Sequence, residues 1–360
     1  MDAVKCKLNP FFRIRFHPRL CCDLFLEETV FDLPSTHYLT FLTQFKAGST
    51  QAQLITQVAH IFDVSSAEGN KILENLMEAR LIIPESRNYP ELPAIKHWVQ
   101  RGWTDALILH LKTRNILYED EQYSDPERYK NEKLRALISR EEVPSFWKLY
   151  PDAKRIELPQ ASHLPQDRTF SEILLSRRSN QPWQNRSTPV EELSNIFHYA
   201  NLELVQLRQK AESMLHEAPE ALLNSSFCAL ETYLMAFNVD SVAAGIYHYD
   251  PKSHALEMMQ EGDKQKELVK MCIGQPNPLR SSFALVISVV WERYMFRYRH
   301  PRAYRNLLVN VSELAQKYLI LATTYRYSQF LTPAFDDLYA DHLFGLNGYE
   351  EAPIYAIAIG

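Results

Sequence analysis

Glycine is scarce in this chain, and its scarcity excludes several kinds of site. Only 9 of the 360 residues are glycine, whereas an average protein contains about 7%. Loops that hold phosphate through backbone amides depend on glycine, and neither G-x-x-x-x-G-K-[ST] nor G-x-G-x-x-G occurs. H-E-x-x-H and G-x-S-x-G are missing as well. The sequence therefore excludes P-loop and Rossmann proteins and argues against zincins and α/β-hydrolases.

Long apolar runs are also lacking. No stretch approaches the roughly 18 to 20 uninterrupted apolar residues of a bilayer-spanning helix. The first residues, MDAVKCKLNPFF, contain no apolar core of a signal peptide. A net charge of -5 gives no global attraction to nucleic acid. We therefore expect a cytoplasmic protein whose partners include neither membranes nor nucleic acids.

The cysteines form no C-x-x-C pair. Their odd number suits reduced thiols in a reducing compartment. Two of them are adjacent in the sequence and are candidates for a metal or redox pair, but no histidine lies nearby, so plain packing is favoured and no metal site is predicted. The five cysteines are Cys6, Cys21, Cys22, Cys228 and Cys272.

The N-terminal residues predict a small winged-helix-like domain. Apolar and polar residues alternate at period two in 13–17 and again toward 30–33, as in half-buried strands. Three amphipathic segments follow, and before the third the residues Ser65 to Glu68 resemble a capping box. The predicted helices are 36–45, which Ser35 would cap, then 50–62 and 68–80, and a strand at 81–83 completes the domain, which we bound at 1–90.

This domain favours peptide docking over DNA binding. The third predicted helix carries Glu68, Glu74 and Glu78 beside Lys71 and Arg80. A helix that enters a DNA groove needs a more basic face. Capture of a peptide on a strand edge, where backbone pairing adds a strand, fits the mixed charge better. A purely structural role is the other alternative.

The rest of the chain predicts a linker and a larger domain. Residues 91–168 contain a helical segment and extended, proline-containing stretches, and 169–360 have the character of a second α+β domain. Arg177, Arg178 and Ser179 follow the apolar stretch 170–175. Two guanidiniums and a hydroxyl suit a phosphate group, to which backbone N–H groups would add. The alternative is a solvated helix end.

Several remaining polar residues are predicted to be structural or solvated. His248 and His254 have no third ligand at metal spacing, so structural roles are favoured. The carboxylate pairs Asp336–Asp337 and Glu350–Glu351 lie in loop-like segments and are expected on the solvated surface. The apolar runs 289–291 and 354–359 predict buried strands.

Two segments of the larger domain carry a family resemblance. The segment GIYHYDP at 245–251, with His-Ala-Leu at 254–256, and RAYR at 302–305, followed by Gln316, resemble motifs of the SagB/McbC-type dehydrogenases. Residues 97–120 are similar to the linker region of these proteins. They are a branch of the FMN-dependent nitroreductase family that acts in the biosynthesis of thiazole- and oxazole-containing peptides.

The resemblance implies both a fold and a reaction. It implies an α+β domain with a central antiparallel sheet flanked by helices, a swapped homodimer with two FMN molecules at its interface, and an N-terminal peptide-recognition domain. The reaction is the oxidation of azoline rings to azoles by hydride transfer to FMN. The precursor peptide is the implied partner, and a cyclodehydratase a further one. The implied FMN-binding residues are Arg177, Arg178, Ser179, Gln181, Ser225 and Gln316.

The resemblance also implies a catalytic Lys-Tyr pair shortly before RAYR. The segment 296–302 has no lysine and is one residue longer. Arg297 and Tyr298 stand in for the pair if the extra residue follows it, and Tyr298 and Arg299 do so otherwise. A guanidinium would stabilise the phenolate of Tyr298, which makes this tyrosine the candidate base. The alternative is that Tyr298 packs among the neighbouring aromatic residues.

Other positions depart from the family pattern and keep further functions open. The family's Pro-Ser-Gly-Gly loop falls at 222–226, where the sequence is Leu-Leu-Asn-Ser-Ser, and its Gly-His becomes Ser312–Glu313. Side chains in place of glycine would crowd a flavin ring. One alternative is a flavin-poor or flavin-free relative that binds a peptide or partner enzyme. Another is a flavin-dependent reductase of dehydroamino acids.

Overall fold

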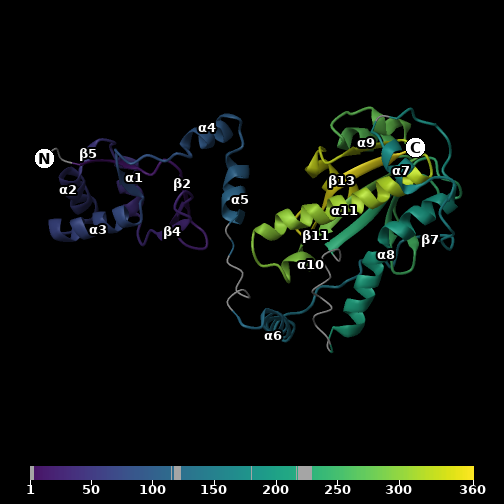
Figure 1. The fold of residues 1–360 in the computed structure, drawn as a ribbon, viewed down its shortest axis with the longest axis horizontal. Coiled ribbons are helices and arrows are strands. Elements are labelled where there is room, and N and C mark those ends of the chain that lie inside the picture. The colour runs from purple at the N-terminus through teal and green to yellow at the C-terminus, as the bar shows by residue number, and fades with distance from the viewer. Residues whose placement is uncertain (1–3, 115, 117–122, 180, 216, 218–228) are drawn as a thin grey trace. The chain divides into compact units, whose positions relative to one another are not determined.

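The chain folds into two compact units, Met1–Leu117 and Tyr118–Gly360. The computed structural model describes residues 4–114, 116, 123–179, 181–215, 217 and 229–360 (Figure 1). The division falls inside the segment 91–168 that the sequence predicts as a linker. Among the described residues, none of the helices combines the length and the apolar character needed to cross a membrane.

The smaller unit contains two three-stranded sheets with helices. One sheet has the strand order β5-β1-β6 and the other β2-β3-β4. A small N-terminal domain with sheet is thus confirmed. Its strands are β1 (Lys5–Leu8), β2 (Phe12–Arg15), β3 (Cys21–Leu24), β4 (Thr29–Asp32), β5 (Ser49–Thr50) and β6 (Ile82–Pro84), and its helices α1 (His37–Gln44), α2 (Gln51–Phe62), α3 (Ser66–Glu78), α4 (Leu92–Gln100) and α5 (Thr104–Arg114).

Local capping explains where two of these helices begin. Thr50 and Ser65 cap α2 and α3 in capping boxes, because each hydroxyl accepts from the backbone of a residue three positions on, whose side chain accepts in return. The predicted cap of the first helix was wrong. Thr36 is the N-cap residue of α1, and the hydroxyl of Ser35 lies 3.2 Å from the ring of His37 instead.

The cysteines act as packing residues. Cys6, Cys21, Cys22 and Cys272 are buried free thiols, whereas Cys228 lies outside the described residues. Burial, with Asp23 and Cys21 adding to it, raises the pKa of Cys22 to about 12. Its thiol is therefore neutral at physiological pH and packs with Cys6 in the core of the smaller unit.

The larger unit is built on a seven-stranded antiparallel sheet. Its order is β12-β13-β11-β8-β9-β10-β7, which confirms the α+β domain with an antiparallel sheet and flanking helices. The strands are β7 (Arg155–Glu157), β8 (Leu230–Ala236), β9 (Gly245–Asp250), β10 (Ala255–Glu261), β11 (Phe283–Val290), β12 (Gln329–Thr332) and β13 (Glu351–Ile359). The helices are α6 (Pro126–Ile138), α7 (Phe170–Ser176), α8 (Val190–Met214), α9 (Gln265–Met271), α10 (Trp291–Met295), α11 (Arg302–Thr324) and α12 (Asp337–Phe344).

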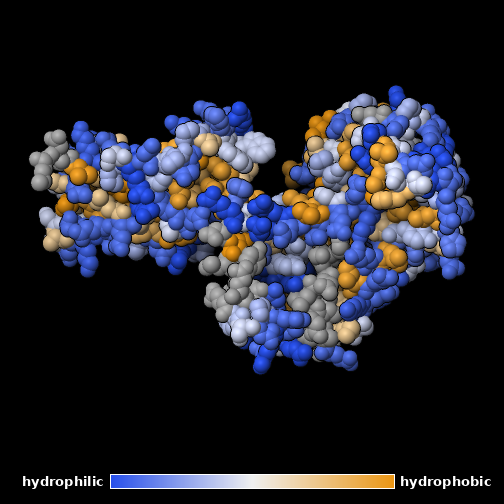
Figure 2. All heavy atoms as spheres, in the orientation of Figure 1, coloured by the Kyte–Doolittle hydropathy of each residue, from blue (hydrophilic) through white to orange (hydrophobic). Residues whose placement is uncertain are grey.

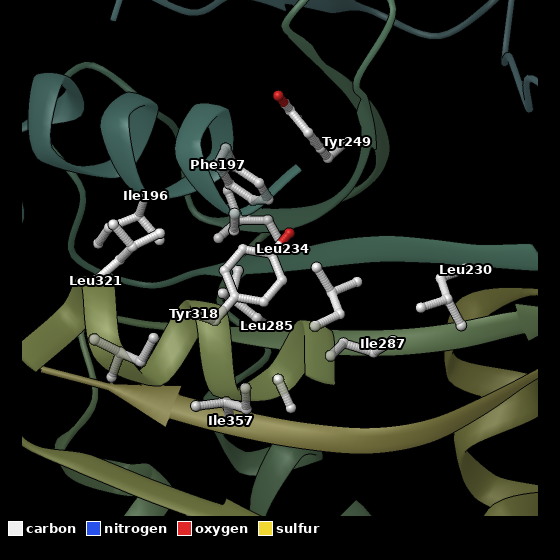
Figure 3. Packing of buried hydrophobic residues seen from close by; sticks show 14 of the residues in the cluster. Ile196, Phe197, Leu230, Leu234, Tyr249, Leu285, Ile287, Tyr318, Leu321 and Ile357 are labelled. Carbon is white, nitrogen blue, oxygen red and sulfur yellow. The ribbon is translucent and has the colours of Figure 1, made fainter. Parts of the chain in front are cut away.

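Different helices cover the two faces of this sheet. On one face, Ile196 and Phe197 of α8 and Tyr318 and Leu321 of α11 meet strand residues such as Leu234 (Figure 3). On the other face, α9 and α12 contribute residues to a second apolar cluster. The central strands β8, β9 and β11 are buried on both faces, which explains the nearly continuous apolar sequence of β11.

The GIYHYDP segment forms β9 and turns directly into β10. Gly245 pairs with Glu261 at a point where the register shifts between Met258 and Gln260. A Cβ atom at Gly245 would lie 2.5 Å from the carbonyl oxygen of Gln260. No larger residue fits there without moving the backbone, so this glycine is required by close strand approach.

Two predictions for the ends of strands need correction. The strand predicted at 289–291 ends at Val290, because Trp291 begins α10. The strand predicted at 354–359 is confirmed, but β13 starts earlier, at Glu351. Glu351 is only 5% exposed, so its predicted place on the solvated surface is wrong.

Candidate functional site

An aromatic groove opens where α10 leads into α11. Its volume is about 880 Å³. Its walls come from the segment 291–307 and from Glu141 and Glu142. Trp291 and Tyr304 form one wall, with ring centroids 5.9 Å apart and an interplanar angle of 21°. We call this feature the aromatic groove.

Tyr298 lines the aromatic groove and has a free hydroxyl. Its ring packs against that of Tyr294, with centroids 4.6 Å apart. The Arg297 guanidinium lies 4.6 Å from the centroid of the Tyr298 ring, within the range of a cation–π contact. The hydroxyl makes no hydrogen bond to any of the described residues, and Tyr298 is one of the residues that line the groove. It can therefore reach a bound molecule.

The geometry separates the two candidates for the partner of Tyr298. Arg297 stacks on its ring. Nη1 of Arg299 instead donates a hydrogen bond to Oε1 of Glu141, at 2.9 Å. Tyr298 also packs among aromatic residues, so the two interpretations of its role are compatible: packing fixes the ring and leaves the hydroxyl exposed to the groove.

Arg177, Arg178 and Ser179 lie immediately after α7. Arg177 is half-buried, whereas Arg178 and Ser179 are exposed. Neither arginine forms an ion pair with another described residue, and Nη1 of Arg178 donates to the Arg177 carbonyl at 2.9 Å, so neither positive charge is neutralised by a described carboxylate. Burial raises the pKa of Tyr355 on β13, and the charge of Arg177 opposes that rise. The segment stands at the C-terminal end of its helix, where the dipole does not attract anions, so the side chains would have to hold a phosphate.

The remaining predicted flavin-binding residues are dispersed. Gln181 is exposed and donates its amide to the Ser176 carbonyl at 3.3 Å, beside the arginine pair. Gln316 is exposed on α11. Ser225 lies outside the described residues.

One chain does not bring Tyr298 and Gln316 together. At a rise of about 1.5 Å per residue, Gln316 lies about 20 Å along the axis of α11 from Arg302, and Tyr298 precedes that helix. Close to the other end of α11, Arg168, just before α7, donates to the Thr323 carbonyl at 3.0 Å. Figure 1 accordingly shows α10 and α7 near opposite ends of α11.

A buried row of charged residues crosses the sheet and was not foreseen from the sequence. It lies on the face packed by α9 and α12, since Tyr233 belongs to that core and Glu231 precedes it by two residues on β8. His248 on β9 is directly opposite Tyr233. Its Nδ1 lies 2.9 Å from Glu257 and its Nε2 3.2 Å from Glu231. The predicted structural role of His248 thus has a definite form.

The charges in this row shift one another's protonation. Burial disfavours charged His248, but its bonds to Glu231 and Glu257 outweigh burial and raise the pKa of His248. Burial likewise opposes ionisation of Glu231, yet the guanidiniums of Arg208 and Arg293 hold the pKa of Glu231 well below its usual range. These contacts therefore favour the charged forms of His248 and Glu231.

A second buried group continues the row toward β13. Glu351 accepts hydrogen bonds from the Ser288 hydroxyl at 2.6 Å and from the Tyr233 hydroxyl at 2.9 Å. Lys148 pairs with Glu351 and donates to Tyr233 at 2.8 Å. The backbone N–H of Tyr150 donates to Glu257 at 3.2 Å. These contacts fix the segment 148–150 onto the sheet, a short distance in sequence after the glutamates of the aromatic groove.

Residues 174–360 match the model of the nitroreductase family. The chain is 33% identical over 334 residues to the trifolitoxin operon protein TfxC of Rhizobium leguminosarum bv. trifolii, covering 87% of this chain and 88% of TfxC. It is 23% identical to the trifolitoxin-processing protein TfxB of the same organism, over 78% of this chain and 76% of TfxB. It is 27% identical to the microcin B17-processing protein McbC of Escherichia coli, over 35% of this chain and 47% of McbC. These matches confirm the resemblance predicted from the GIYHYDP and RAYR segments.

Proposed function

Because this chain belongs to the nitroreductase family, we propose that it oxidises azoline rings in a ribosomally made peptide to azoles with FMN. Relatives with processing roles in trifolitoxin and microcin B17 production support a peptide substrate. The observation that carries the proposal is the unpartnered Tyr298 hydroxyl in an aromatic groove large enough for a heterocycle and its neighbours.

Aromatisation removes two hydrogens from the ring, one as a hydride and one as a proton. FMN, when bound, supplies the hydride acceptor. Tyr298 takes the proton at its phenolate oxygen, and the Arg297 guanidinium stacks on its ring and holds it in place. The aromatic walls of the groove exclude water from the ring and hold its plane.

The residues present fit a flavin phosphate at the end of α7. Arg177 and Arg178 have no competing carboxylate among the described residues, and Ser179 adds a hydroxyl. Tyr298 lies near the far end of α11, so one chain alone does not gather both parts of the site. We propose that a homodimer with antiparallel α11 helices does so. Exposed apolar residues on α11, among them Val309 at 66%, support this interface, and Figure 2 shows apolar side chains interrupting the hydrophilic surface of the larger unit.

The smaller unit is proposed to dock the precursor peptide. In the sheet β2-β3-β4, β4 is an edge strand, and Val30 on it is 49% exposed. An extended peptide would add a strand to this edge through backbone hydrogen bonds. A cyclodehydratase that forms the azoline is the partner enzyme that this substrate requires.

The visible spectrum of the purified protein tests the flavin requirement. Flavin absorbance at about one FMN per chain is expected, whereas a colourless protein that ignores added FMN would exclude azoline oxidation by this route. A colourless protein would also exclude dehydroamino acid reduction, because that reaction consumes reduced flavin.

Tyr298→Phe tests the base. Loss of the proton acceptor should lower turnover by about 100-fold or more while the yellow colour remains. Tyr349→Phe is the control, because Tyr349 is 90% exposed and lies outside the aromatic groove. Unchanged turnover of Tyr298→Phe would show that another group takes the proton.

A further inference from the structure

We infer that the aromatic groove binds a positively charged side chain of the substrate peptide, an arginine or lysine close to the ring that is oxidised. This inference rests on the proposed function for the identity of the peptide. The binding chemistry itself follows from the walls and charges of the groove.

The first support is a fixed aromatic wall. The indole N–H of Trp291 donates to the Gly348 carbonyl at 3.0 Å, which holds the indole plane. Tyr304 stacks on it and remains 46% exposed. A guanidinium or ammonium group that lies over such a face is attracted by the ring quadrupole, most strongly for tryptophan.

The second support is the charge of the lining. Glu141, Glu142 and Glu292 contribute three negative charges and Arg299 one positive charge, so the lining residues sum to -2. Arg299 is already paired with Glu141. Glu142 and Glu292 form no ion pair with other described residues, and both are exposed. Two carboxylates are therefore available to a cation.

No other titratable group in the lining cancels this charge at neutral pH. Burial and the nearby Arg302 lower the pKa of His300, so its ring is neutral. Arg297 stacks on Tyr298 and is absent from the lining. The apolar lining residues Met295 and Leu307 can contact the methylene stem of a long basic side chain while its charged end reaches the carboxylates.

Binding of synthetic peptides to the full chain tests the inference. Each peptide contains one azoline ring and one neighbouring residue, which is arginine, its neutral isostere citrulline, or glutamate. Kd is measured by fluorescence anisotropy with FMN-loaded Tyr298→Phe, so that binding is read without turnover. The arginine peptide should bind about 10-fold more tightly than the citrulline peptide, and the difference should shrink as salt is added.

A double variant locates the charges. Glu142→Gln with Glu292→Gln should remove most of the preference for arginine. Glu191→Gln is the matched control, because Glu191 is exposed on α8, outside the groove, and should leave the preference intact. Equal Kd values for the three peptides, or an unchanged preference in the double variant, would overturn the inference.

The outcomes also separate this inference from the proposed function. If the wild-type protein binds the arginine peptide selectively but forms no azole, the inference about the groove stands and azoline oxidation is excluded. If it forms the azole but shows no preference for a charged peptide, azoline oxidation stands and the inference about the groove is wrong. If Met295→Asp dissociates an oligomer while peptide affinity stays the same, a second copy of the chain covers the groove and the inference is wrong.

Discussion

At the scale of single residues, the pair Lys148–Glu351 has the clearest energetic consequence. Both side chains are largely withdrawn from water, at 21% and 7% exposure. Burial opposes the charge of Lys148, and Glu351 outweighs that effect and raises the pKa of Lys148. Removing one charge of a buried pair leaves the other charge unpaired in the protein interior, and that unpaired charge destabilises the folded state.

Glu351→Gln should therefore destabilise the larger unit by about 3 kcal/mol. Urea unfolding followed by tryptophan fluorescence measures the change. Glu350→Gln offers a control at the adjacent, exposed position and should alter stability by less than about 0.5 kcal/mol. Equal effects of the two substitutions would mean that the Lys148 ion pair contributes nothing to stability.

His248 gives the molecule a pH dependence of known sign. Its pKa is raised in the folded protein, so its charged pairing with Glu231 and Glu257 is fully present below the unfolded value of about 6.5 and is lost as pH rises through the folded value. The free energy of unfolding should thus fall as the pH rises above about 6.5, and His248→Gln should remove this part of the slope. The exposed His163, substituted in the same way, should leave the slope as it is. Parallel pH profiles for wild type and His248→Gln would show that His248 is neutral in the folded protein.

The sequence singles out individual residues where a motif exists, and it fails to do so where only burial distinguishes them. Tyr298 could be singled out because it precedes RAYR, and the structure does place its ring in an open groove. Glu350 and Glu351 are chemically identical and adjacent in the sequence, yet one is exposed and the other buried. The partners of Glu351 distinguish them, and these lie far away in the sequence: Lys148, 203 positions away, together with Tyr233 and Ser288.

At the scale of elements, α7 and the arginines after it carry a prediction for cofactor binding. Each arginine that bonds a phosphate is worth about 1.5 to 3 kcal/mol. Arg177→Gln with Arg178→Gln should therefore raise the Kd for FMN about 100-fold, measured by quenching of flavin fluorescence. Arg280→Gln, at the exposed last residue of η4 (Asn277–Arg280), should leave this Kd unchanged. If the double variant binds FMN as tightly as the wild type, the phosphate lies elsewhere.

Elements with local signals were predictable, and those without were not. The capping boxes at Thr50 and Ser65 fixed the starts of α2 and α3 within the sequence itself. Trp291 follows an apolar strand and is itself apolar, so nothing local marks the end of β11. The buried row on β8 and β9 was not predicted. The sequence alone does not tell whether a glutamate or histidine within an apolar strand faces solvent or a buried charged partner.

At the scale of the whole molecule, the division into two units agrees with separate tasks for peptide docking and chemistry. The smaller unit has its own apolar core, made of residues such as Leu54 and Leu73, so it depends little on the larger one for stability. A chain that lacks residues 1–114 should keep FMN and lose affinity for the precursor peptide, measured by anisotropy of a labelled peptide. Undiminished peptide affinity would assign docking to the larger unit.

Mixing two inactive variants tests how the halves of the site are assembled. Tyr298→Phe lacks the base, and Arg177→Gln with Arg178→Gln lacks the two arginines proposed to bind the flavin phosphate. If each site combines Tyr298 of one subunit with the arginines of the other, a heterodimer contains one intact site. Random exchange makes half of the dimers mixed, so activity should return to about one quarter of wild type. If both parts belong to one chain, no dimer contains an intact site and the mixture stays inactive. That result would exclude the antiparallel arrangement of α11. It would place the proton acceptor and the flavin phosphate within a single subunit.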